Sequence, residues 1–206
     1  MNIKSNKMTA MLFAALLMVF MGNEVFAAYC VPAGTNSTYY LNDFSTTGGS
    51  TNISNLGSGF SPGGYGDFTA MTLTASRGDL VSFSASGYST FGFRIWIDMN
   101  HDDVFDPVSE VVWNSGSYLG TQTGSFYIYP NALTGPTRMR VVYHYLNSAG
   151  LIDPCSTTHN YGEFEDYTVN ILAGSTNPVP YCTPVGTNSS YFVNNFSTTG
   201  GTATNI

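Results

Sequence analysis

Apolar and polar residues alternate along much of the chain between residues 68 and 172, and this two-residue period restricts the fold more than any other feature. Side chains of a β-strand point alternately to the two faces of a sheet, so a segment with this period buries one face and exposes the other. The segments that we expect to be strands are residues 68–75, 80–85, 91–98, 110–113, 125–129, 138–145 and 166–172.

The composition supports the same fold class. The chain has 22 glycines, 14 tyrosines and 14 phenylalanines, and only 9% of its residues are charged. Aromatic and β-branched residues favour strands, and glycine with serine, threonine and asparagine favours turns. We find no amphipathic helical segment of useful length. The sequence therefore predicts an all-β protein, a β-sandwich of jelly-roll or Ig-like type with seven or more strands.

A near-copy within the chain sets the domain boundaries. The segment beginning YCVPAGTNSTYY at Tyr29 recurs as YCTPVGTNSSYF at Tyr181, a period of 152 residues, which is the length of a whole domain. We expect a module at residues 28–172, a linker at 173–180, and a truncated start of a second module at 181–206. The neighbouring tandem modules of a longer protein would then be among its partners.

The first 27 residues have the pattern of a cleavable signal peptide. Lys4 and Lys7 precede an apolar run, and small residues precede a cleavage position near Ala27. We therefore expect a secreted or cell-surface protein without a membrane span. Removing this segment leaves four basic and twelve acidic residues, a formal net charge of −8, which argues against nucleic acid as a partner.

Nine of those twelve acids fall in two short stretches, residues 98–110 and 153–166. The first carries oxygen-bearing side chains at every second position, a spacing that suits Ca²⁺, which takes six to eight oxygen ligands. The expected donors are the side chains of Asp98, Asn100, Asp102, Asp106 and Glu110 and the carbonyl group of Val104. The alternative is a solvated acidic turn without a cation.

The second stretch leads into a strand. Glu163 and Glu165 are expected on one face of that strand and Asp166 on the other. Some of the three acids would complete the same calcium shell from across the module. The alternative is that they pair with Arg138 and Arg140, which share one face of another expected strand.

Three cysteines in an exported chain raise the question of pairing. Cys30 and Cys155 bracket most of the first module and are expected to form a disulfide. Cys182 occupies the position of Cys30 in the second copy, so its partner would lie in the remainder of that copy. A bridge between Cys155 and Cys182 is the alternative.

Several separated segments resemble the motifs of the GEVED domain family. These are YGEFEDYTV from Tyr161, IWIDMNHDDVF from Ile95, GPTRMRV from Gly135, and FSTTGG with NISNLGSGFS before them. Phe164 replaces the signature valine, and Asp103 replaces the glycine usual after the Asp-x-Asn-x-Asp pattern, so we expect Asp103 to adopt a left-handed conformation. The resemblance implies a secreted or surface protein like those of Bacteroidota, with such modules in tandem, and implies no particular ligand.

We therefore expect a non-enzymatic, calcium-stabilised module that acts as a spacer or adhesion element. No catalytic residue is assigned. A Gly-x-Ser-x-Gly pattern begins at Gly59, but Pro62 follows the serine and lacks the N–H group that an oxyanion hole requires. The alternatives are an accessory region of a secreted peptidase, or a module that binds a carbohydrate, such as a surface glycan, or another ligand. The candidate stacking residues of a binding module are Tyr88, Trp96, Trp113, Tyr127 and Tyr129.

Overall fold

The computed structural model describes residues 28–145 and 152–174 and confirms the all-β class. Eight strands form one mixed sheet that folds over on itself. A single 3₁₀ turn, η1 (Pro62–Gly64), interrupts them within the described residues. The strands are β1 (Leu41–Thr47), β2 (Ser54–Leu56), β3 (Tyr65–Ser76), β4 (Leu80–Ile97), β5 (Val111–Asn114), β6 (Leu119–Tyr127), β7 (Gly135–Tyr145) and β8 (Gly162–Leu172).

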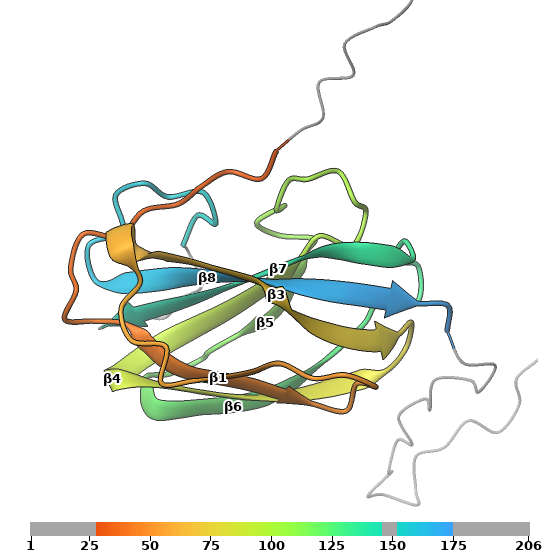
Figure 1. The fold of residues 1–206 in the computed structure, drawn as a ribbon, viewed down its shortest axis with the longest axis horizontal. Coiled ribbons are helices and arrows are strands. Elements are labelled where there is room, and N and C mark those ends of the chain that lie inside the picture. The colour runs from red at the N-terminus through yellow and green to blue at the C-terminus, as the bar shows by residue number, and fades with distance from the viewer. Residues whose placement is uncertain (1–27, 146–151, 175–206) are drawn as a thin grey trace, which may run out of the picture.

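Strand β4 belongs to both layers of the sandwich (Figure 1). Its first half pairs with β1 on one side and β6 on the other, and its second half pairs with β7 and β5. The sequence predicts two strands here, residues 80–85 and 91–98, and the structure joins them through a bend. Gly87 lies at that bend, where a Cβ would collide with the ring of Tyr143.

The second layer continues from β4 through β7 and β8 to β3. Strands β7 and β8 are antiparallel, whereas β8 and β3 are parallel. An isolated bridge between Thr51 and Thr74 connects the turn after β1 to β3, so the two layers also touch at their open edge.

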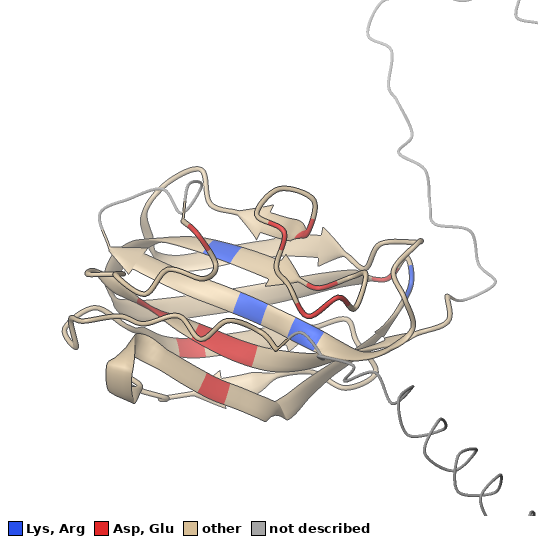
Figure 2. Ribbon diagram, turned by 90° about the horizontal axis from the view of Figure 1, so that it is seen from above, with Lys and Arg blue, Asp and Glu red and all other residues tan. Residues whose placement is uncertain are grey.

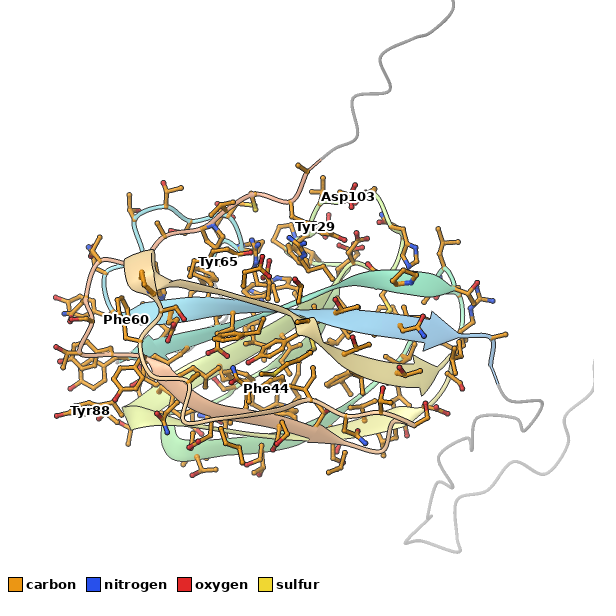
Figure 3. The ribbon with its side chains drawn as sticks, in the orientation of Figure 1. Tyr29, Phe44, Phe60, Tyr65, Tyr88 and Asp103 are labelled. Atoms are coloured by element: carbon orange, nitrogen blue, oxygen red, sulfur yellow. A yellow bond between two sulfur atoms is a disulfide. The ribbon has the colours of Figure 1, made fainter. Side chains whose placement is uncertain are left out.

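A predominantly apolar core fills the space between the layers, where Figure 3 shows Phe44. The alternating residues expected on inward faces are buried, including Phe93, Ile95, Val141 and Val169. Burial of a large apolar side chain contributes roughly 1.5 to 3 kcal/mol each, so this core is the main source of stability.

Strands β1 and β2 are absent from the sequence prediction. In β1 the buried Leu41 and Phe44 are three positions apart, because a bulge between Leu41 and Asp43 shifts the register with β4. The bulge removes the two-residue period from this strand.

The outer face of the second layer carries a smaller cluster, formed by Trp96, Phe105, Val142 and Phe164. The N-terminal segment covers it and is tied to the loop before β8 by the Cys30–Cys155 disulfide, which confirms that pairing. Closing a loop with a sequence separation of 125 residues contributes roughly 4 to 5 kcal/mol in the chain-entropy model.

The expected signal peptide, the second module from residue 181 and Cys182 lie outside the described residues, as does all but the start of the expected linker. Over residues 28–145 and 152–174, no helix has the length and apolar character needed to cross a membrane.

Candidate metal centre

The acidic loop of residues 98–110 connects β4 to β5 on the outer side of the second layer. Its two ends are held together, because Ile97 N–H donates to the carbonyl oxygen of Glu110 at 3.0 Å. Seen from above, the loop lies over the sheet beside the arginines of β7 (Figure 2). The carboxylates at the ends of the loop, Asp98 and Glu110, are 0% and 4% exposed.

The oxygens at alternate positions of the loop accept backbone N–H groups from within it. Asp98 accepts from Asp102 at 3.3 Å and from Asp103 at 3.1 Å, through different oxygens. Asn100 Oδ1 accepts from Asp102 N–H at 3.1 Å, and Asp102 Oδ1 accepts from Val104 N–H at 3.0 Å. The side chains of Asp98, Asn100 and Asp102 therefore turn toward the inside of one tight loop.

Two non-glycine residues give the loop its curvature. His101 and Asp103 have φ angles of 56° and 63°, in the left-handed region. The expectation for Asp103 is confirmed, and aspartate accepts this conformation more readily than most residues because its short side chain bonds locally. Figure 3 shows Asp103 close to Tyr29 at the outer surface.

Glu110 closes the loop from its C-terminal end. Its Oε1 accepts from Met99 N–H at 3.1 Å and its Oε2 from Asp106 N–H at 2.9 Å. Burial raises the pKa of Glu110, and the charges of Asp98 and Asp102 raise it further. The charges of Asp98 and Asp102 thus oppose the ionised form of Glu110, and a cation would relieve that repulsion.

Asp106 has a different local role. Its Oδ1 accepts from Val108 N–H at 2.8 Å and from Ser109 N–H at 2.6 Å, and these bonds lower the pKa of the carboxyl group. Asp106 therefore caps the turn that leads to Glu110. Val104 is exposed beside it.

The structure does not bring Glu163 and Glu165 to this loop. The two side chains point to one face of β8 and Asp166 to the other, as expected, but the glutamates face the core between the layers and are 0% exposed. Glu163 accepts from Ser61 N–H at 2.7 Å and from Leu41 N–H at 3.2 Å. It therefore fixes the backbone around η1 and the start of β1.

Glu165 belongs to a buried polar network in the same layer. Tyr167 donates to its Oε2 at 2.5 Å, and Asn55 donates to the Tyr167 hydroxyl at 2.9 Å. Burial raises the pKa of Glu165 to about 8 and that of Glu163 to about 7. For Glu165 the neighbouring charge of Glu163 adds to the effect.

Asp166 pairs with arginine. It lies opposite Arg140 in the β7–β8 ladder, and the buried Arg140 binds it through Nε at 2.6 Å and Nη2 at 2.7 Å. Arg138 approaches the same carboxylate at 3.5 Å. For Asp166 the structure thus shows the pairing that the sequence left as an alternative.

Tyr29 is the residue of this region that sequence reasoning missed. Its hydroxyl donates to Asp98 Oδ2 at 2.5 Å, and the guanidinium of Arg138 lies 4.3 Å from the centre of its ring. Tyr29 and Asp98 are 69 residues apart, and no local pattern connects them. The contact joins the acidic loop to the segment that the disulfide holds.

No group of three or more His, Cys, Asp or Glu side chains within the described ranges is arranged to hold a metal ion. A cation in the loop would therefore have at most two of the carboxylates of Asp98, Asp102 and Glu110 as ligands in this arrangement, and the Asn100 amide oxygen and the Val104 carbonyl would have to supply further oxygens. These are hard oxygen donors of the kind that Ca²⁺ accepts in irregular geometry.

The candidate stacking residues are dispersed. Trp96 is fully buried, and Trp113 packs edge-on against Phe83 in the core. Tyr88 and Tyr127 are exposed, at 64% and 44%. Tyr129 lines a cavity at the base of the acidic loop.

Comparison with known families gives one match. Residues 92–170 match the family model described as GEVED domain, a segment that runs from the second half of β4 through most of β8 and includes the acidic loop. The match confirms the resemblance of the sequence motifs. None of the curated proteins matches the chain.

Proposed function

Since residues 92–170 of this chain match the GEVED domain, we propose that the protein is a non-enzymatic, secreted or cell-surface module with a calcium-stabilised sandwich. It acts as a spacer or adhesion element within a tandem-repeat protein. The family match supports an extracellular type of module, and the near-copy that begins at Tyr181 supports the repeat.

The arrangement of Asp98 and Glu110 is the observation that carries the calcium proposal. Both carboxylates are buried at the neck of one loop, and neither pairs with a basic side chain of the described residues. Hydrogen bonds from loop N–H groups and from Tyr29 offset part of the cost of burying these two ionised carboxylates, and a counter-charge would offset more of it. A divalent cation supplies the charge that the loop lacks.

The ion would have a structural role. Asp98 directly follows β4 and Glu110 directly precedes β5, so a shared cation would hold the two strand ends together. Through Tyr29, which donates to Asp98, the same ion would strengthen the attachment of the N-terminal segment. The described residues then supply a rigid unit that needs no catalytic group.

Calcium is expected to raise the melting temperature of the purified chain. At a hundredfold excess over its dissociation constant, calcium adds about 2.7 kcal/mol to the free energy of unfolding. For a domain of this size the gain corresponds to about 5 to 10 °C. Thermal melts followed by circular dichroism, with calcium and with EGTA, measure the difference.

Asp102→Asn is expected to remove most of that difference, and Asp67→Asn is its matched control. Both aspartates are exposed, and the Oδ1 of each accepts the N–H of the residue two positions ahead. Only Asp102 belongs to the acidic loop. Equal melting temperatures of the wild-type chain in calcium and in EGTA would show that the proposed site is wrong.

A further inference from the structure

A cavity of about 320 Å³ lies between the base of the acidic loop and the turn that follows β6. Leu133 N–H donates to the Met99 carbonyl at 2.8 Å, which fixes the turn against the loop. Within the turn, Ala132 N–H donates to the Tyr129 carbonyl at 3.1 Å. The cavity is therefore formed by hydrogen-bonded backbone on both sides and is present before any ligand binds.

Part of the cavity lining is aromatic and apolar. The ring of Tyr129 is held in place because its hydroxyl donates to the Val111 carbonyl at 3.2 Å. Met99, Ala132 and Leu133 extend the apolar surface. An aromatic ring held at a cavity wall offers a platform for the C–H face of a ligand.

The remaining lining is polar and mostly neutral. Asn100, Ser109 and Asn131 contribute two amides and a hydroxyl group, and Glu110 contributes a carboxylate. Asn100 Nδ2 uses one N–H for Asp102 and retains the other. The cavity thus offers both donors and acceptors beside an apolar wall.

The size and charge of the cavity restrict its ligand. Its volume lies near the lower end of the range for small-molecule sites, roughly 300 to 1,000 Å³, so it fits one ring and not a chain. The lining contains Glu110 and no lysine or arginine, so an anionic ligand would be repelled. A pyranose ring combines an apolar C–H face with a rim of neutral hydroxyl groups, and it matches both conditions.

We propose that this cavity binds a single neutral pyranose residue, with its C–H face on Tyr129 and its hydroxyl groups at Asn100, Ser109 and Asn131. The proposal extends the function beyond a structural module and does not require the calcium site. Of the five candidate stacking residues, it uses Tyr129 alone.

Titration of the purified chain with methyl glycosides of glucose, galactose, mannose and N-acetylglucosamine tests the proposal. Saturation-transfer difference NMR and protein chemical-shift changes report the binding. At least one probe is expected to bind with a dissociation constant on the order of 1 mM, as suits a ligand of this size. Lysine methyl ester, a small cation that the Glu110 carboxylate could attract, is titrated for comparison. The proposal is overturned if no glycoside binds at tens of times 1 mM, or if lysine methyl ester is the only probe that binds.

Leu133→Trp is expected to fill the cavity and weaken binding at least tenfold. Leu119→Trp is the matched control, because Leu133 and Leu119 are 49% and 51% exposed and only Leu133 lines the cavity. Binding that survives in Leu133→Trp would place the site elsewhere and contradict the proposal. The titration is repeated in EGTA, so binding in both buffers supports the cavity even if the calcium proposal fails.

Discussion

Replacing Arg140 with methionine is expected to lower the free energy of unfolding by about 3 to 5 kcal/mol, because the change leaves the buried Asp166 without its main counter-charge. Both side chains are 0% exposed and form a two-bond ion pair. Removing one partner of such a pair costs more than replacing both, since the remaining charge keeps its full desolvation penalty.

All five N–H donors of the Arg140 guanidinium have an acceptor. Two go to Asp166, and the others go to the Cys30 carbonyl at 2.8 Å, the Pro154 carbonyl at 2.7 Å and the Cys30 sulfur at 3.2 Å. The substitution therefore also releases both chain segments that the disulfide joins. Urea unfolding measures the loss of free energy, provided that the slope of the free energy of unfolding against urea concentration is the same in the wild-type chain and the variant.

Arg138→Met is the control for this prediction. Arg138 lies on the same face of β7, but its side chain is 28% exposed and its nitrogen is 3.5 Å from Asp166. Its loss is expected to cost about 1 kcal/mol or less, as for other partly exposed pairs. The double variant Arg140→Met with Asp166→Leu should recover part of the stability. If Arg138→Met and Arg140→Met cost the same, Arg140 is not the central contact that the structure indicates.

Raising the pH from 6.5 to 8.5 is expected to lower the free energy of unfolding by about 2 to 3 kcal/mol through Glu163 and Glu165. Their pKa values in the folded chain are about 7 and about 8, both above the ordinary value of 4.5. Over this pH range the folded state holds protons that the unfolded state has lost. Stability is therefore present at low pH and declines as the pH rises through the folded pKa values.

The contacts of Glu165 agree with a protonated carboxyl group. Ser58 Oγ lies 3.3 Å from Glu165 Oε1, 3.0 Å from the Leu41 carbonyl and 3.2 Å from the Asn42 carbonyl. A hydroxyl has one proton to donate, so Ser58 satisfies one carbonyl and accepts from Glu165 when that carboxyl is protonated. The same geometry suits the amide of glutamine.

The variant Glu165→Gln is expected to remove more than half of the pH dependence, because Glu165 has the higher pKa, and to be the more stable protein at pH 8.5. Asp43→Asn is the control, because hydrogen bonds lower the pKa of Asp43 and it does not titrate in this range. Burial lowers the pKa of His144 to about 4 and also lowers that of His159. Melts at several pH values measure the effect. A slope that persists unchanged in Glu165→Gln would exclude Glu165 as its cause.

Periodicity located the strands that bury one face, and it failed where the backbone departs from a regular strand. The bulge in β1 and the bend at Gly87 both interrupt the alternation, and both depend on neighbours far along the chain. The parallel pairing of β3 with β8 joins strands about a hundred residues apart and leaves no local signal.

Local spacing predicted part of the shape of the acidic loop, because Asp98, Asn100 and Asp102 accept backbone N–H groups from residues at most five positions ahead of them. It could not separate the acids of β8, since alternation places Glu165 and Asp166 on opposite faces without saying which face meets the core. Only the folded chain shows that Tyr29 binds Asp98 and that Arg140 binds the Cys30 carbonyl, because both contacts join residues far apart in the sequence.

The disulfide also determines how the module would respond to tension applied at its ends. Force entering near Cys30 passes through the sulfur bridge directly to Cys155 and bypasses the 125-residue separation between them. The extensible part is then the segment from Cys155 to the end of β8 at Leu172, roughly 18 residues or about 60 Å when drawn out. Most of that segment is β8 itself, which is bonded along its length to β7 and β3 and must slide past both to be released. The bulk of the sandwich would stay folded under a load that extracts its last strand.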